Sequence, residues 1–198
     1  MRIAAIVLAA GASTRLGEPK QLIEHGGVPL VRRAAIAALD AGARPVIVVL
    51  GAEAERIAPA LDGLEGVTLV INAKWSDGLA SSLGSGLDAF AADPGIDGVL
   101  ITLADQPRVD TNVLRTIVGA YGPAHRIVAS AYSNILGVPA LIGKEYFSDL
   151  MQLTGHRGAG QWLTDRSGGV TAIPLSAPML DIDTREDLRR LRATGSII

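Results

Sequence analysis

The stretch LAAGASTRLGEPKQL, residues Leu8 to Leu22, decides the fold. It begins at the end of the apolar run Ile3–Ala9, so the chain passes from this run directly into a glycine-containing loop. An apolar run that passes straight into a glycine-containing loop is typical of a buried strand in an α/β protein. In such folds the ligand binds at the carboxyl ends of the strands. Gly11 allows a positive φ and close approach of the backbone to a ligand, while Arg15 and Lys20 add positive charge. The stretch therefore predicts a polyphosphate-binding loop.

The spacing of this loop excludes two common phosphate-binding motifs. The dinucleotide fingerprint requires G-x-G-x-x-G, whereas Gly11 is followed by Ala-Ser. The P-loop requires G-K-[ST], whereas Gly17 is followed by Glu-Pro-Lys. Pro19 opposes a long helix directly after Gly11, so we expect an extended cradle that carries Lys20 back over the bound phosphates. The alternative interpretation is a strand-to-helix turn with two solvated basic residues.

The same stretch resembles the signature of the MobA-like nucleotidyltransferases, L-A-A-G-x-S-x-R-L-G-x-P-K-Q-L, and matches it from Leu8 through Leu22. Within that family it is most similar to the molybdenum cofactor cytidylyltransferase (MocA-type) branch. The resemblance implies that the loop wraps the triphosphate of a nucleotide and that Arg15 and Lys20 are also catalytic. The loop residues that it assigns to nucleotide binding are Leu8, Ala9, Ala10, Gly11, Ser13, Arg15 and Lys20.

The composition indicates one globular domain spanning residues 1–198, since 48% of the residues are hydrophobic and can build a sizeable core. The resemblance implies that this is a nucleotidyltransferase domain. The formal net charge of −2, from 18 basic and 20 acidic residues, argues against bulk electrostatic binding to nucleic acid or to a membrane. The absence of cysteine excludes disulfides, thiolate zinc sites and cysteine nucleophiles. We find no signal-type leader and no apolar run that could span a bilayer, so we expect a cytoplasmic protein.

Strand-like and helix-like segments alternate along the chain. The predicted strands are 3–9, 44–50, 67–71, 98–103, 127–132, 137–142 and 170–174. The predicted helices are 29–41, 53–61, 79–91, 110–121, 144–153, 159–165 and 184–191. This alternation implies an α/β fold with a single-domain, doubly wound, mostly parallel sheet. Together with the resemblance it predicts a Rossmann-like, GT-A-like nucleotidyltransferase.

An acidic residue follows the predicted strand 98–103, in the sequence Ala-Asp-Gln-Pro. A carboxylate at the end of a strand can hold Mg²⁺, a hard cation that prefers oxygen ligands and bridges nucleotide phosphates. The alternative is that Asp105 only forms the turn before Pro107. The resemblance favours the metal, because D-Q-P after an apolar strand is similar to the family's second motif, in which the aspartate binds Mg²⁺. Asp105 is therefore predicted to be catalytic and a metal ligand.

A second pair of carboxylates lies in LDIDT, residues 180–184. If this segment is extended, Asp181 and Asp183 point to the same face. The alternative, which we prefer for Asp181, is a polar strand end before a helix that Thr184 and Asp187 cap. D-I-D-T followed by a charged helix resembles the family's terminal motif, which makes Asp183 the predicted second metal or substrate contact.

The segment NAKWSDGLASSL, residues 72–83, joins a predicted strand to a helix. Small and hydroxyl residues at a helix start can approach a base or ribose and leave amides free for an anion. A simpler interpretation is N-capping of the helix by Ser76 or Asp77. In the family this region resembles the wall that reads the nucleotide, so Gly78 and Ser82 are assigned to nucleotide binding.

The acceptor side departs from the family's pattern. Residues 132–141 resemble the segment before the acceptor-side strand, but residues 155–160 read G-H-R-G-A-G where the family usually shows G-D-x-G-A-R. His156 and Gly160 thus replace an acid and an arginine. The histidines of the chain lack the spacing of metal ligands, so no metal is assigned to them.

These parts favour direct in-line transfer, since no cysteine nucleophile and no Ser-His-Asp arrangement is present. A phosphate oxygen of the acceptor would displace pyrophosphate from the α-phosphorus of a nucleoside triphosphate, with Mg²⁺, Lys20 and Arg15 stabilising the developing charge. The resemblance implies CTP and molybdopterin as substrates and a molybdoenzyme as client. Ala10 favours CTP over GTP, because the related guanylyltransferase branch shows L-A-G-G there. The alternatives are transfer to another acceptor, with GTP and molybdopterin or with a sugar phosphate, and a non-catalytic carrier of molybdenum cofactor.

Overall fold

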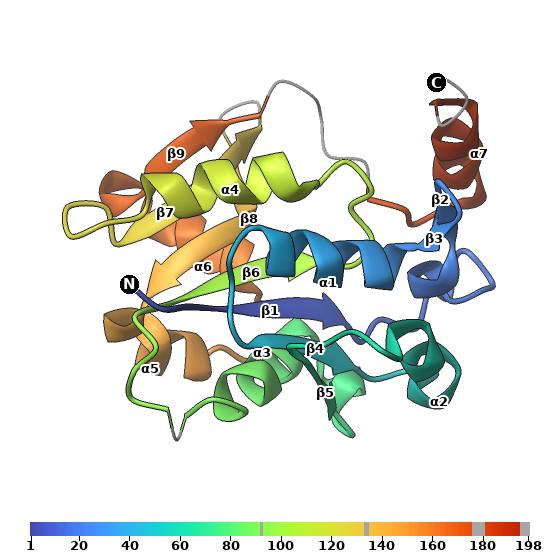
Figure 1. The fold of residues 1–198 in the computed structure, drawn as a ribbon, viewed down its shortest axis with the longest axis horizontal. Coiled ribbons are helices and arrows are strands. Elements are labelled where there is room, and N and C mark those ends of the chain that lie inside the picture. The colour runs from blue at the N-terminus through green and yellow to red at the C-terminus, as the bar shows by residue number, and fades with distance from the viewer. Residues whose placement is uncertain (92, 133–134, 176–180, 195–198) are drawn as a thin grey trace.

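The structure is a computed structural model that describes residues 1–91, 93–132, 135–175 and 181–194 (Figure 1). A seven-stranded sheet with the order β5-β4-β1-β6-β8-β7-β9 forms its centre. The strands of this sheet are β1 (Ile3–Ala9), β4 (Val46–Leu50), β5 (Val67–Ile71), β6 (Gly98–Leu103), β7 (Ile127–Tyr132), β8 (Ile135–Gly143) and β9 (Thr171–Pro174). The α-helices are α1 (Leu30–Asp40), α2 (Ala54–Ile57), α3 (Leu79–Asp88), α4 (Thr111–Ala120), α5 (Phe147–Met151), α6 (Ala159–Asp165) and α7 (Arg185–Thr194).

The prediction of a doubly wound, mostly parallel α/β sheet is confirmed. β1 pairs in parallel with β4 and β6, β4 with β5, and β7 with β9. β8 runs antiparallel to both of its neighbours, β6 and β7. The sequence did not predict this reversal, because the apolar pattern of a buried strand is the same in either direction.

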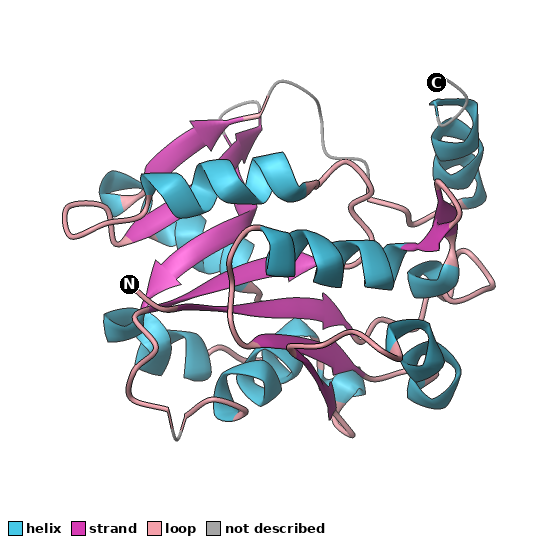
Figure 2. Cartoon of the chain, in the orientation of Figure 1, coloured by secondary structure: helices cyan, strands magenta, loops and turns pink. Residues whose placement is uncertain are grey.

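Helices cover both faces of the sheet, with α1 and α4 on one face and α3, α5 and α6 on the other (Figures 1 and 2). Successive residues of a strand point to opposite faces, so Ala5 and Val7 of β1 join the core under α1 and α4. Ile6 and Leu8 join the core under α3, α5 and α6. Because both faces are covered, every residue of β1 is buried, which explains the continuous apolar run in the sequence.

Several predicted boundaries shift for identifiable reasons. The predicted helix 53–61 is α2 followed by the 3-10 helix Ala58–Leu61, which contains Pro59. Proline has no backbone N–H to continue α-helical hydrogen bonding. The predicted helix 144–153 likewise begins as the 3-10 helix Lys144–Tyr146 before α5. The two-residue strands β2 (Glu24–His25) and β3 (Val28–Pro29) were not predicted, since they are too short to show a periodicity.

The carboxyl-terminal helix α7 packs against the loop after β1 rather than against the main sheet. Its start is the predicted capping box: the amide of Thr184 donates to Asp187 at 2.8 Å, and the amide of Asp187 donates to Thr184 Oγ1 at 3.2 Å. A separate hydrophobic cluster joins α7 to the loop and to the start of α1. Its members are Leu16, Ile23, Leu30, Ile182, Leu188 and Leu191. No helix in the described part of the chain is long and apolar enough to cross a membrane.

Two glycines of α3 allow a test of the contact between α3 and β1. A Cβ on Gly84 would meet no atom within 4 Å, whereas a Cβ on Gly86 would lie 2.9 Å from Cδ1 and Cγ2 of Ile6. Gly84→Ala should therefore raise the free energy of unfolding by up to about 1 kcal/mol, the difference in helix propensity. Gly86→Ala should lower the free energy of unfolding, because overpacking costs about 1–3 kcal/mol and this exceeds the gain in helix propensity. Chemical denaturation of both variants measures this difference, and equal stabilisation of both would show that α3 can move away from β1.

Candidate active site

A cavity of about 340 Å³, called here the first cavity, opens at the carboxyl ends of β1 and β6. Most of the residues assigned to nucleotide binding from the sequence line it. These are Leu8, Ala9, Ala10, Gly11, Lys20, Gly78 and Ser82. Asp105 lines it as well, whereas Ser13 and Arg15 are not among its lining residues. The location agrees with the rule that ligands of open α/β sheets bind at this edge.

The loop after β1 offers free amides to an anion. In the described part of the chain, the backbone N–H groups of residues 11–14 donate no hydrogen bond. Gly11 does not have a positive φ; the residues of this loop with a positive φ are Ser13 at 54° and Gly17 at 84°. A Cβ on Gly11 would make only an ordinary van der Waals contact, with Cε of Lys20 at 4.0 Å. Unpaired amides beside a basic side chain are suited to phosphate oxygens.

Gln21 holds this loop from below, a role that the sequence analysis did not assign. Its side chain is 1% exposed. Its Nε2 donates to the carbonyls of Ala9 at 2.8 Å and Gly11 at 2.9 Å. The predicted ligand Ser13 also has an internal role, because its hydroxyl accepts from the amide of Lys20 at 3.0 Å. The position of Gln21 beside a loop lysine was the only sign of this role in the sequence. The burial of Gln21, which makes the role possible, depends on the tertiary fold.

The structure brings together four charged residues that the sequence analysis assigned to the site: Arg15, Lys20, Asp105 and Asp183. The Lys20 ammonium donates to Asp105 and, at 2.9 Å, to Asp183, and Arg15 pairs with Asp183 at 2.7 Å. Burial alone would lower the pKa of Lys20, but the charges and hydrogen bonds of Asp105 and Asp183 raise it above its ordinary value. Lys20 is therefore a permanent cation at neutral pH. Burial would raise the pKa of Asp183, but the hydrogen bond and charge of Lys20, with the charge of Arg15, hold it below its ordinary value.

Backbone contacts explain how the terminal segment reaches this group. The amide of Ile182 donates to the carbonyl of Asp105 at 3.1 Å, which places Asp183 beside Lys20. Asp181 instead accepts from Nε2 of Gln106 at 3.0 Å. The side chain of Asp105 hydrogen-bonds to Lys20, and its backbone lies in the turn that follows β6. Leu180, part of the predicted extended segment, lies outside the described residues.

The donor set of Asp105 and Asp183 fits a hard divalent cation. No group of three or more His, Cys, Asp or Glu side chains converges in the described ranges. Asp105 and Asp183 nevertheless both contact one cation, the Lys20 ammonium. A metal ion at the position of this ammonium would have the two carboxylates as its negative ligands. Mg²⁺ is typically held by one or two carboxylates, with substrate phosphates and water as the remaining ligands. Two carboxylates beside free loop amides match that requirement.

The wall opposite the loop is built by residues 72–83. Asn72 Nδ2 donates to the hydroxyls of Ser81 at 2.9 Å and Ser82 at 3.0 Å, which positions Ser82 in the first cavity. N-capping of α3 by Ser76 or Asp77 is wrong, since the N-cap is Gly78 and no side chain caps it. Gly78 has a φ of 109° and packs directly against the carbonyl of Gly155. This contact requires glycine and joins the wall of residues 72–83 to the segment 155–160.

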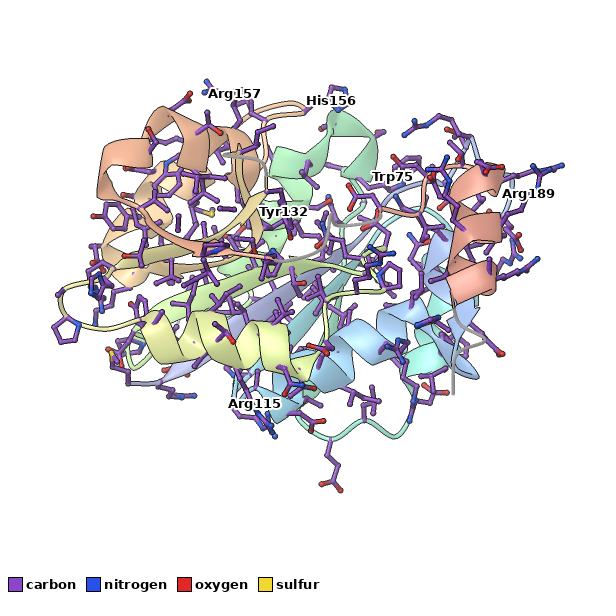
Figure 3. All side chains as sticks on the ribbon, turned by 90° about the horizontal axis from the view of Figure 1, so that it is seen from above. Trp75, Arg115, Tyr132, His156, Arg157 and Arg189 are labelled. Atoms are coloured by element: carbon purple, nitrogen blue, oxygen red, sulfur yellow. The ribbon has the colours of Figure 1, made fainter. Side chains whose placement is uncertain are left out.

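A second cavity of about 530 Å³ adjoins the first, and Leu8, Leu79, Leu103 and His156 line both. The two segments that the sequence placed on the acceptor side border it, one at Tyr132 and one at His156 (Figure 3). Arg157 does not line it and forms an exposed ion pair with Asp165 at 2.5 Å. The site thus has a charged compartment and a neighbouring compartment with few charges.

Comparisons with known proteins agree on one family. The model of the MobA-like NTP transferase domain matches residues 5–170. Nicotine blue oxidoreductase of Paenarthrobacter nicotinovorans is 32% identical over 96% of both chains. The crystal structure of Rv0371c from Mycobacterium tuberculosis is 32% identical with a TM-score of 0.81, over 96% of this chain and 98% of that one. The manganese complex of that protein aligns over 100% of both chains at 31% identity and a TM-score of 0.77. A nucleotidyl transferase from Methanothermobacter is 27% identical with a TM-score of 0.83, over 98% and 97% of the chains.

The role of Gln21 in holding the loop is testable. Gln21→Ala removes the donor to two carbonyls and should lower the free energy of unfolding by about 1–3 kcal/mol. Because the loop loses its support, affinity for a nucleoside triphosphate should fall as well. Thermal unfolding and CTP titration measure the two effects, and Gln152→Ala, at an exposed position, is the matched control. A variant with lower stability but unchanged CTP affinity would show that the loop does not depend on Gln21 for its binding conformation.

Proposed function

The chain belongs to the MobA-like NTP transferase family, and from this premise we propose that it is a molybdenum cofactor cytidylyltransferase. It would transfer CMP from CTP to the phosphate of molybdopterin and release pyrophosphate, for delivery of the product to a molybdoenzyme client. The observation that carries the proposal is the Lys20 ammonium between Asp105 and Asp183, beside a loop with unpaired amides. This combination suits a triphosphate and a divalent cation together.

Each part of the site has a role in in-line transfer. The loop amides, Arg15 and Lys20 bind the phosphates and hold the α-phosphorus in line with the acceptor. A phosphate oxygen of the acceptor attacks this phosphorus, the bond to the bridging oxygen of the β-phosphate breaks, and pyrophosphate leaves with both electrons of that bond. Lys20 and Arg15 stabilise the negative charge that develops. No covalent intermediate with the protein is required.

Asp105 and Asp183 would hold Mg²⁺. When bound, the ion neutralises charge on the phosphate oxygens and favours departure of pyrophosphate. The manganese complex of the mycobacterial relative supports the use of a divalent cation by this family. The nucleotide phosphates give Lys20 and Arg15 new anionic partners, which frees the two carboxylates for the metal.

The base preference follows from Ala10, which lines the first cavity and is 8% exposed. Its methyl group occupies space that a glycine would leave for the edge of a larger base. CTP should therefore bind more tightly than GTP. Competition binding that showed GTP to be equal or better would remove this part of the proposal.

A redox reaction is the second candidate function, and it rests on the full-length relative named nicotine blue oxidoreductase. The apolar lining of the second cavity would admit an aromatic dye. The charged first cavity favours phosphate chemistry over this alternative. Reduction of nicotine blue by a hydride donor, assayed beside nucleotidyl transfer, separates the two.

The decisive experiment is a pyrophosphate-release assay with CTP and GTP against molybdopterin and sugar phosphates. We expect release with CTP and molybdopterin. Asp105→Asn keeps the volume but loses the charge, so turnover should fall by about 100-fold or more while the protein folds normally. Asp88→Asn, at an exposed position of α3, is the control and should transfer at the wild-type rate. Normal turnover by Asp105→Asn would show that the catalytic metal binds elsewhere. If the Asp105→Asn variant unfolds, Asp105 has a structural role instead.

Competition between Lys20 and the metal gives a second prediction. Arg15, Lys20, Asp105 and Asp183 form a group with two positive and two negative charges, so free metal must displace Lys20 before it reaches both carboxylates. Lys20→Met should raise the affinity for Mn²⁺ without nucleotide by about 10-fold or more, since one charge at close range can contribute that much in a partly buried site, while nearly abolishing transfer. Titration followed by electron paramagnetic resonance measures free Mn²⁺, with Lys144→Met as the exposed control. Unchanged Mn²⁺ affinity in Lys20→Met would show that Lys20 does not compete with the metal for Asp105 and Asp183.

A further inference from the structure

The edge strand β5 lacks the features that normally keep the edge of a sheet from pairing with another chain. β5 and β9 are the two end strands of the sheet (Figure 1). Edge strands are usually protected by a proline, a charged side chain, a bulge or a covering segment, because their free N–H and C=O groups otherwise pair with a second chain. β9 contains Pro174. β5 reads V-T-L-V-I and pairs with β4 in an unbroken register, so it has no proline, charge or bulge.

The apolar side chains of β5 are exposed to solvent. Leu69 is 38% exposed and Ile71 is 67% exposed, so no segment of the described chain covers this strand. Successive residues of a strand point to opposite faces, so both lie on the same face as Val67, which packs against the core under α1 and α4. No residue of β5 lines either cavity. A ligand in the cavities therefore does not account for this exposed apolar row.

The hydrogen bonds of β5 with β4 determine which of its backbone groups remain free. The amide of Asn72, directly after the strand, donates to the carbonyl of Leu50 at 2.8 Å, so Asn72 faces β4. In a parallel pair, every second residue bonds to the same neighbouring strand. The residues in between point their N–H and C=O groups to the free edge, and they are Val67, Leu69 and Ile71. The amide of Val67 also makes one long bond within its own turn, to the carbonyl of Leu64 at 3.4 Å.

These free groups are arranged so that β5 is complementary to itself. In an antiparallel pair, two opposite residues exchange both of their backbone hydrogen bonds when their groups face each other. A two-fold axis beside Leu69 would set this residue opposite its own copy, and Val67 opposite Ile71 of the second copy. Every outward residue then meets another outward residue. The exposed apolar side chains form cross-strand pairs on one face, and such pairs stabilise a sheet.

The charges at the two ends of β5 favour the antiparallel arrangement. Glu65 lies just before the strand and Lys74 just after it, and both are exposed. A parallel pair of two copies would bring like charges together at each end. An antiparallel pair brings the acidic end of one copy beside the basic end of the other, and opposite charges at the rim of an interface favour association.

We propose that β5 is the interface of a symmetric homodimer, in which two copies of the chain pair antiparallel about Leu69 and join their sheets. The partner is a second copy because the strand matches itself in backbone hydrogen bonds, apolar side chains and terminal charges. A two-fold interface uses the same surface on both copies and closes the assembly. The strand left at each end of the joined sheet is β9, whose Pro174 cannot donate to a further strand. This inference does not rest on the proposed function, since it involves no residue of either cavity.

Sedimentation of the full chain over a concentration series measures the dimer. Leu69→Lys puts two positive charges opposite each other at the two-fold axis and should raise the dimer Kd at least about 10-fold. Met151→Lys is the matched control, because Met151 is 44% exposed and lies in α5, outside the interface. It should leave the Kd within about twofold. A chain that stays monomeric up to about 100 µM, or a dimer that Leu69→Lys does not weaken, would overturn the inference.

Leu69→Cys tests the register, because the chain contains no cysteine of its own. Opposite residues that exchange backbone hydrogen bonds have Cα atoms about 5.5 Å apart, which is within the range of a disulfide. Leu69→Cys should therefore give a disulfide-linked dimer on mild oxidation, whereas Met151→Cys should not. Crosslinking of Leu69→Cys that is no greater than that of Met151→Cys would overturn the pairing about Leu69. If Leu69→Lys fails to fold, the crosslinking result decides.

Discussion

The parallel alignment of β1 with β4 and β6 is the constraint on which the rest of the structure depends. The registers pair Ala9 with Leu50 and Leu8 with Leu103, so the three strands end at one edge of the sheet. The segments after β1 and β4 remain paired beyond the ends of these strands, because the amide of Ala52 donates to the carbonyl of Ala10 at 3.1 Å. A Cβ on Gly51 would lie 2.8 Å from the carbonyl oxygen of Ala10, which shows how closely these loops approach. The phosphate loop and Asp105 are neighbours because of this alignment.

Charge balance organises the site at that edge. A partly buried ammonium is unfavourable unless anions surround it, and Lys20 has two carboxylates as partners. The group is electrically balanced without substrate. In the proposed reaction, a triphosphate with a divalent cation would replace this balance with another, in which the phosphates pair with the basic side chains and the metal with the acids. The same charges that hold these four residues in place would then bind the substrates.

The two cavities differ in charge. Lys20 and Asp105 line the first, beside the unpaired loop amides, whereas the second is lined by the carboxylate of Asp181 and by no lysine or arginine of the described chain. The segment 155–160, in which the sequence departs from the family's pattern, lies between them, with His156 in both linings and Gly155 against Gly78. Under the proposed function, variation there would change the acceptor while the loop after β1 stays the same.

The sequence by itself determined the strands of the main sheet, most of the helices and the motif of the loop after β1. These features depend on local patterns: continuous apolar runs, glycine and proline positions, and a motif from Leu8 to Leu22. The direction of β8, the burial of Gln21 and the position of β5 at an edge of the sheet were decided only by the tertiary structure. The contact between Lys20 and Asp183, 163 residues apart, is the clearest case. It exists because a hydrophobic cluster holds α7 against the phosphate loop, and no local pattern specifies which distant surfaces will pack together.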